Sequence, residues 1–109
     1  MIPGVYVLTG SSCASPANAG FRVFDGRGIS GSATRACRST VRSSDGEAYR
    51  VDQSCEDTYS GQRTTAAQTI RIPDPQSFTL VEQGETAMSF RRCPTGEAPD
   101  YLEEMVAAD

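Results

Sequence analysis

Carboxylates are the most numerous side chains in this sequence that could act as a general acid or base. The chain has 109 residues, with 14 Asp and Glu but no His, the side chain that most often transfers protons near neutral pH. Glu56 and Asp57 are neighbours in a predicted strand, so their side chains point to opposite faces. Glu82 and Glu85 flank a predicted hairpin tip, where carboxylates are normally solvated. The sequence therefore predicts no catalytic residue, and we expect a protein that is not an enzyme.

A glycine-rich run at residues 26–31 (GRGISG) matches the spacing of a dinucleotide-binding fingerprint. That fingerprint requires glycines that open a helix, because the helix N-terminus receives the pyrophosphate. Here residues 32–41 have the pattern of a strand, so the glycines are expected to permit a hairpin and a twisted strand. No cofactor is predicted.

The four cysteines are Cys13, Cys37, Cys55 and Cys93. They contain no Cys-x-x-Cys pair, and zinc ligands usually occur in close pairs. Without His, a zinc site would need all four thiolates, so two disulfides are the better interpretation and no metal site is predicted. Disulfides persist in oxidising compartments. We therefore expect a periplasmic or secreted protein whose leader peptide has been removed, since residues 1–3 (MIP) do not resemble the start of one.

Hairpin register favours one pairing of two of these cysteines. Residues that face each other across a hairpin have numbers with a constant sum, and they share a face of the sheet. A hairpin centred on Gly46 pairs Val41 with Val51 and also Cys37 with Cys55. The same rule applied to hairpins centred on Gly26 and Gly84 pairs Val23 with Ile29, Leu80 with Met88, and Phe78 with Phe90.

The second predicted disulfide joins Cys13 to Cys93. We expect these residues at the same edge of an up-and-down sheet, because one follows the first strand and the other ends the last. Cys93 has the parity of the polar Arg91, so it must lie just past the regular strand. The rival pairing is Cys13–Cys37 with Cys55–Cys93.

Short stretches rich in Val, Ile, Phe, Tyr and Thr, separated by Gly and Pro, dominate the chain before residue 94. This pattern is typical of an antiparallel sandwich or barrel. We expect an all-β fold, an antiparallel meander of seven or eight short strands that forms a small barrel or curled sheet, with a short C-terminal helix. The predicted strands cover residues 4–9, 21–24, 28–42, 48–57, 63–72, 77–82 and 86–93.

The C-terminal segment differs from the rest of the chain in pattern and charge. Residues 1–94 are expected to form a disulfide-bonded β domain, and residues 95–109 an acidic linker and a short amphipathic helix over about 99–107, packed on that domain. Docking of the helix on a partner is the alternative. The apolar residues of its predicted face are Tyr101, Leu102, Met105 and Val106, with Glu103 and Glu104 opposite.

All ten basic residues are Arg, and the formal net charge is −4. Residues 93–109 contribute five acidic residues and no base, so the rest of the chain is near neutral. Nucleic-acid binding needs a basic footprint, but the six Arg between residues 22 and 50 are interleaved with acidic residues. We expect no nucleic-acid partner. No apolar run is long enough for a transmembrane segment.

The hairpin centred on Gly46 changes from apolar to polar along one face. In order, its pairs are Val41–Val51, Ser39–Gln53, Cys37–Cys55 and Arg35–Asp57. A face against a sealed core should stay apolar, because unpaired buried polar groups are costly. We therefore expect this end to open to water, with Arg35 and Asp57 paired at the rim.

The connection beside this rim contains residue types that are common in interface anchors, Tyr and Arg. Loops held on a rigid scaffold often carry binding, so we expect a recognition surface here. The alternative is that the strands simply leave the barrel. The candidate binding residues are Arg35, Glu56, Asp57, Tyr59 and Arg63.

Three runs, at residues 4–13 (GVYVLTGSSC), 45–55 (DGEAYRVDQSC) and 90–94 (FRRCP), resemble small exported four-cysteine β proteins of alphaproteobacteria, a mostly uncharacterised group. The resemblance is a spacing pattern over about residues 10–94 and includes no catalytic signature. It implies a periplasmic β domain and no activity. The size and layout are also similar to those of periplasmic lysozyme inhibitors, small disulfide-bonded β-barrels whose signature loops this sequence lacks.

Three functions fit these observations. The first is a non-enzymatic periplasmic binding or inhibitor protein that acts on another exported or envelope protein, for example a cationic hydrolase. The second is a lipocalin-like carrier of a small apolar ligand, which would need an interior cavity. The third is an accessory subunit of a cell-envelope complex, held by the acidic tail helix.

The cysteine interpretation predicts a protein without free thiols. Alkylation without reductant, followed by intact-mass measurement, should add no label, whereas prior reduction should allow all four cysteines to react. Substantial labelling of the unreduced protein would contradict two disulfides. A peptide map that links Cys13 to Cys37 would reject the pairing but leave the oxidising compartment in place.

Overall fold

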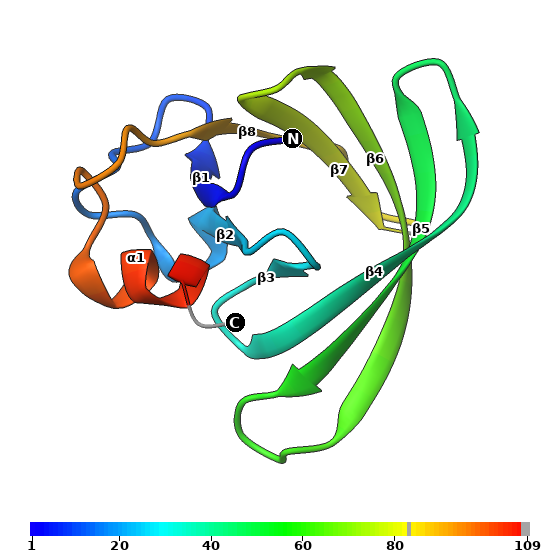
Figure 1. The fold of residues 1–109 in the computed structure, drawn as a ribbon, viewed down its shortest axis with the longest axis horizontal. Helices are drawn as coiled ribbons and strands as arrows, with labels where there is room; N and C mark the ends of the chain where they lie inside the picture. The colour runs from blue at the N-terminus through cyan, green and yellow to red at the C-terminus, as the bar shows by residue number, and fades with distance from the viewer. Residues whose placement is uncertain (83, 108–109) are drawn as a thin grey trace.

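Eight antiparallel strands form one sheet in the computed structural model, which describes residues 1–82 and 84–107 (Figure 1). The order in the sheet is β3-β2-β1-β8-β7-β6-β5-β4, so chain neighbours lie side by side and the first strand pairs with the last. The strands are β1 (Gly4–Leu8), β2 (Phe21–Phe24), β3 (Ile29–Ser30), β4 (Thr34–Asp45), β5 (Ala48–Asp57), β6 (Arg63–Asp74), β7 (Ser77–Glu82) and β8 (Met88–Arg92). A 3-10 turn (Asn18–Gly20) precedes β2, and helix α1 (Asp100–Ala107) ends the chain.

The predicted all-β fold with a short C-terminal helix is confirmed. The two edge strands, β3 and β4, follow each other in the chain, and Ser39 of β4 donates its N–H to the carbonyl of Arg27 at 2.8 Å. The sheet is therefore a nearly closed barrel with its seam between β3 and β4. The seam needs Gly28, because a Cβ there would overlap the backbone of Cys37.

Four of the seven predicted strands differ from the structure at their boundaries, the smallest difference being that of β1, which ends at Leu8, one residue before the predicted end. The predicted strand 28–42 is divided between β3 and β4, because the chain turns at residues 31–33, where Gly31 N–H donates to Thr34 Oγ1 at 2.8 Å. β6 continues through Pro73 to Asp74, beyond the predicted stop, although its pairing is irregular there. β8 begins at Met88, two residues after the predicted start. Gln83, in the predicted loop 83–85, and residues 108–109 of the predicted tail lie outside the described residues.

Hairpin register is correct in the hairpin around Gly84, correct only for residues 38–41 of the hairpin around Gly46, and wrong in the first. In the hairpin around Gly46, irregularities between Arg35 and Arg38 and between Val41 and Ser43 shift the pairing on either side. The observed partners of Val41, Leu80 and Phe78 are Val51, Met88 and Phe90, as predicted. Ile29, however, faces Phe24 and not Val23. The turn between these strands spans residues 25–28, where the Asp25 carboxylate accepts the backbone N–H groups of Arg27 and Gly28. This four-residue turn shifts the pairing by one residue.

An aromatic cluster fills the barrel interior. The ring of Tyr6 contacts Phe78 edge-on at 5.1 Å, and Phe78 stacks on Phe90 at 5.0 Å between ring centroids. The Tyr6 hydroxyl is satisfied by the carbonyl of Ile2 at 2.5 Å, and burial raises the pKa of this hydroxyl. Each buried aromatic or aliphatic side chain of this kind contributes about 1.5–3 kcal/mol. The remaining buried members of this inner core are Ile29, Val51, Ile70 and Leu80.

A second core lies outside the barrel, where α1 covers β1 and β2 (Figure 1). Val5 and Val7 of β1 point into it, while Tyr6 points inward, so β1 is buried on both faces. A strand buried on both faces has a continuous apolar sequence, as residues 5–8 (VYVL) do. Leu102 of α1 is fully buried here, and Met105 and Val106 pack beside it. Tyr101 does not join them, because its side chain is 57% exposed.

The disulfides are Cys13–Cys93 and Cys37–Cys55, as predicted, and hairpin register was the basis for the second of them. The reason expected for Cys13–Cys93 was wrong. β1 and β8 are antiparallel neighbours, so their C-terminal ends lie at opposite ends of the barrel. The loop after β1 instead returns to the outer core, where Arg91 donates to the carbonyl of Ser11 at 2.7 Å. Cys93 lies just past β8 and faces the outer core.

The packing of α1 in the outer core predicts how much this helix contributes to the free energy of unfolding. Leu102→Ala should lower the free energy of unfolding by about 2–5 kcal/mol, because it leaves a cavity among buried side chains. Thermal or urea denaturation measures the change. Tyr101→Ala is the matched control and should alter stability by less than about 0.5 kcal/mol, since exposed positions contribute little. Equal effects of the two substitutions would contradict packing of α1 on the barrel.

Candidate functional site

Three of the five predicted binding residues form a row across the outer face of β4, β5 and β6. Arg35 and Arg63 lie on either side of Glu56 in register. Arg35 Nη2 is 2.8 Å from Glu56 Oε1. Arg63 donates to the carbonyls of Ser54 and Ala36, each at 3.0 Å, so its guanidinium joins all three strands.

The predicted pair Arg35–Asp57 is wrong. A β-bulge between Arg35 and Arg38 inserts one extra residue into β4, and this moves Arg35 opposite Glu56. Ala36 in the bulge has a φ of 49°, which is left-handed and uncommon for a residue with a Cβ. The register rule assumes equal residue numbers on both strands, so it fails beyond this point.

Asp57 has a structural role in the turn after β5. Its Oδ1 accepts the backbone N–H groups of Tyr59 and Ser60, each at 2.8 Å. These hydrogen bonds, Ser60 first, lower the pKa of the Asp57 carboxyl, because they favour its ionised form. The turn leaves the Tyr59 side chain 86% exposed at its tip. Asp57 therefore orders the turn that carries Tyr59.

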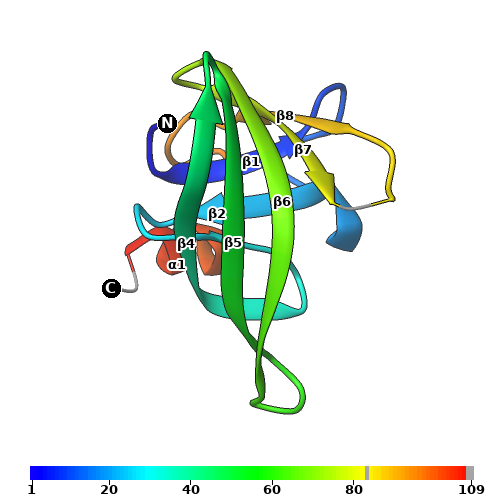
Figure 2. The same cartoon turned by 90° about the vertical axis from the view of Figure 1, so that its right-hand side faces the viewer.

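The outer face of β4, β5 and β6 carries most of the positive charge of the molecule. We call this surface the arginine face. No helix covers it, and Figure 2 views it directly, with α1 behind the sheet. Three carboxylates, Asp45, Asp52 and Glu56, lie within it among the described residues, since Asp45 is in register with Ala48 and Arg71. Its exposed arginines are Arg35, Arg38, Arg42, Arg50, Arg63 and Arg71.

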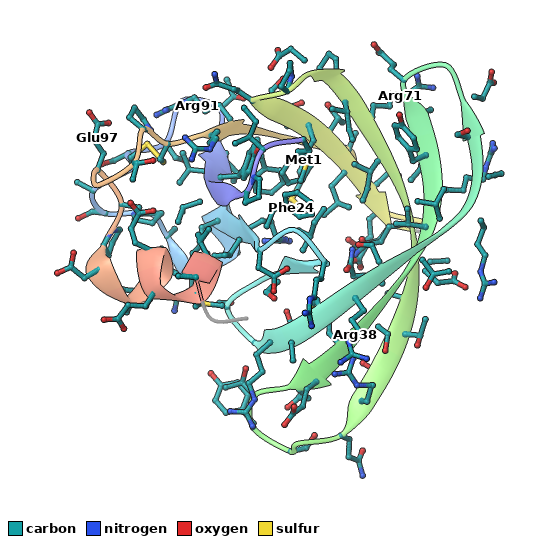
Figure 3. All side chains as sticks on the ribbon, viewed as in Figure 1. Met1, Phe24, Arg38, Arg71, Arg91 and Glu97 are labelled. Carbon is teal, nitrogen blue, oxygen red and sulfur yellow. A yellow bond between two sulfur atoms is a disulfide. The ribbon has the colours of Figure 1, made fainter. Side chains whose placement is uncertain are left out.

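Half of these arginines are held by the protein and half are not. Arg35 pairs with Glu56, Arg42 pairs with Asp52 at 2.6 Å, and Arg63 binds backbone carbonyls. Within residues 1–82 and 84–107, no hydrogen bond or ion pair holds the side chains of Arg38, Arg50 and Arg71. Figure 3 labels Arg38 and Arg71 on the side of the molecule away from α1.

A shallow groove of about 410 Å³ runs along the arginine face toward β7. Arg42 and Arg50 border it, and the small side chains of Ala67 and Thr69 are among its lining. Two carboxylates, Asp52 and Glu82, also line it, and Asp52 pairs with Arg42. The groove therefore combines a depression with charged groups of both signs, of which Arg50 is an unpaired donor among the described residues.

The polar end of the barrel contains a cavity of about 300 Å³. Gln53 and Cys55 line it, as expected for the face that changes from apolar to polar along β5. Three further residues that the sequence did not suggest also line it: Arg22 of β2, Gln68 of β6 and Glu82 of β7. This cavity is therefore assembled from strands that are distant in sequence.

Hydrogen bonds order the two glutamines of this cavity. Gln53 Oε1 accepts the backbone N–H of Ile29 at 3.0 Å and the Ser39 hydroxyl at 2.8 Å. Its amide group donates to Gln68 Oε1 at 3.3 Å, and the amide group of Gln68 donates to Glu82 Oε1 at 2.9 Å. The direction of donation is therefore fixed along this series of hydrogen bonds, which ends at the Glu82 carboxylate.

The sequence did not indicate Arg22 because the two faces of β2 are reversed relative to the usual expectation. Phe21 and Val23 are apolar and would normally face the barrel interior, which would place Arg22 in solvent. In the structure α1 covers Phe21 and Val23 from outside, so Arg22 points into the barrel, with its guanidinium over the Phe90 ring at 5.2 Å. The apolar helix face at residues 102–106 was the only sequence signal for a second core.

Comparison with known proteins gives no relative for this chain: no family model, curated protein or solved structure matches it. In the described part of the chain, no group of three or more His, Cys, Asp or Glu side chains could hold a metal ion. None of the helices in these ranges is long and apolar enough to cross a membrane.

The turn at Asp57 predicts local protection that depends on pH. Because its carboxyl pKa is lowered on folding, the stabilisation is present above the pKa of the unfolded chain and is lost as pH falls through the folded value. Asp57→Ala should make the amides of Tyr59 and Ser60 exchange several-fold faster near neutral pH, measured by hydrogen exchange. Asp74→Ala is the control, because Asp74 accepts only from its own turn, at Gln76 and Ser77. Unchanged exchange at Tyr59 and Ser60 in Asp57→Ala would refute this role.

Proposed function

We propose that this protein is a non-enzymatic binding protein that captures another exported or envelope protein through the arginine face. The observation that carries the proposal is the charge distribution. A chain with a formal net charge of −4 displays six arginines and three carboxylates on one uncovered face. Concentrating one sign of charge against the net charge favours recognition of the opposite sign.

The partner surface that fits is acidic. Arg38, Arg50 and Arg71 have donors available for carboxylates, and Arg binds carboxylates with paired hydrogen bonds. A cationic hydrolase would be repelled here, so an inhibitor of such an enzyme is not the form of the function that we propose. Tyr59, at the end of the same face, supplies an exposed aromatic side chain of the kind that anchors interfaces.

The compartment supports a protein as the partner. Two disulfides suggest an oxidising, extracellular-type environment, where folded proteins are available and nucleic acid is not the usual polyanion. We propose the periplasm, in keeping with the sequence resemblance described above.

The two alternative functions have less support in the geometry. An apolar recess of about 150 Å³ lies beside Met1 and Phe24, which Figure 3 labels. It is smaller than the pockets of about 300–1,000 Å³ that hold small-molecule ligands, so it does not favour an apolar carrier. An accessory subunit held by α1 would need an apolar helix face, but Leu102, Met105 and Val106 already pack on the barrel.

Capture from a periplasmic extract tests the proposal. The tagged chain should retain an acidic protein at low salt, and the triple substitution of Arg38, Arg50 and Arg71 by Gln should reduce capture by about tenfold or more, since it removes donors and attraction together. Raising the ionic strength should weaken capture by the wild-type chain, because exposed charges are screened. Quantitative mass spectrometry of the retained proteins provides the measurement.

A matched control separates the arginine face from total charge. The triple substitution of Ser15, Thr86 and Ala87 by Glu makes the same change of net charge at exposed positions outside the face, and it should leave capture unchanged. Equal loss in both triple variants, or retained capture in the arginine variant while its melting temperature is normal, would overturn the proposal. Salt-dependent capture of nucleic acid in place of an acidic protein would also overturn it.

A further inference from the structure

We infer that the cavity at the polar end of the barrel binds a small zwitterion of amino-acid size, with its carboxylate on Arg22 and its ammonium group on Glu82. The inference does not depend on the arginines of the arginine face, because none of them lines this cavity; Glu82 lines both the cavity and the groove along that face.

Arg22 supplies the cationic side of the cavity. Its guanidinium is half-buried over the Phe90 ring, and one nitrogen, Nη1, donates to the carbonyls of Phe21 at 2.7 Å and Ala19 at 3.5 Å. In the described ranges, Nε and Nη2 have no hydrogen-bond acceptor and no carboxylate lies within ion-pair distance. A planar guanidinium that is fixed at one nitrogen and open at two others suits a carboxylate.

Glu82 supplies the anionic side. Its Oε1 accepts from Gln68, which is itself oriented by Gln53. A carboxylate can accept about four hydrogen bonds. Among the described residues Gln68 is the only hydrogen-bond partner of the Glu82 side chain, so capacity remains for an ammonium group. The order of the glutamines fixes the position of the carboxylate before a ligand arrives, and such preorganisation lowers the cost of binding.

The pairing of these two charges defines the ligand class. Arg22 and Glu82 line one cavity and influence each other electrostatically, but they do not form an ion pair. A ligand with one charge would satisfy one side and leave the other half-buried without a partner, which is unfavourable. A zwitterion satisfies both. The volume of about 300 Å³ is at the lower end of small-molecule sites, which limits the ligand to a few heavy atoms.

Titration of ¹⁵N-labelled protein, followed by NMR, tests the inference. The probes are L-alanine and L-glutamine as zwitterions, with propionate and propylamine as single-charge controls, each added to about 10 mM, because few-atom ligands bind with dissociation constants of about 1 mM. The amino acids should shift the side-chain amide signals of Gln53 and Gln68 in a saturable manner. Each single-charge control should bind about tenfold more weakly or not at all.

Two variants assign the charges. Arg22→Gln and Glu82→Gln should each weaken amino-acid binding by about tenfold or more, and Glu82→Gln keeps an acceptor for Gln68. Glu97→Gln removes the same charge at an exposed position near the outer core and should leave binding unchanged (Figure 3). If Arg22→Gln fails to fold, judged by its melting temperature, Glu82→Gln decides alone. Absence of saturable shifts with both amino acids, binding of propionate or propylamine as tight as that of the amino acids, or unchanged amino-acid binding in Glu82→Gln would overturn the inference.

Discussion

The pairing of β1 with β8 is the constraint on which the rest of this molecule depends. It joins the N-terminal strands to the C-terminal hairpins and converts a meander into a nearly closed barrel. Both cores require it, because Tyr6 of β1 faces the aromatic cluster inside while Val5 and Val7 face α1 outside. The disulfide Cys13–Cys93 spans 80 residues across the same junction, and closing a loop of that length restricts the unfolded chain by about 4 kcal/mol in the chain-entropy description.

Barrel closure also determines what the two faces of β5 can do. Residues alternate along this strand between the outer arginine face and the interior, so Arg50 and Asp52 lie outside while Val51 and Gln53 lie inside. One strand thus contributes to a charged outer surface and to an ordered polar cavity. Gln68 and Glu82 line both the polar cavity and the groove along the arginine face, but none of the six arginines of that face lines the cavity. Substitution of those arginines can therefore alter binding at the outer face without removing a side chain from the cavity.

Local pairing rules were sufficient for a large part of the fold. The apolar residues around Gly46 and Gly84 match in only one register, since a shift by one residue places Val41 against Arg50. That register also placed Cys37 beside Cys55, and the helical spacing of Leu102, Met105 and Val106 predicted α1. These features depend on residues close in sequence, for which turn geometry and side-chain alternation leave few possibilities.

The candidate sites depended much more on tertiary structure. The sequence by itself determined an all-β fold, two disulfides, a C-terminal helix and a hairpin face that becomes polar at one end. Only the tertiary structure decided that a bulge at Ala36 places Arg35 opposite Glu56. It also decided that helix α1 covers the outer face of β2, so that Arg22 points into the barrel. It also brought the arginines of three strands onto one uncovered face. The physical reason is that a bulge and a second core change which side of a strand is buried, and neither is encoded in the alternation of that strand.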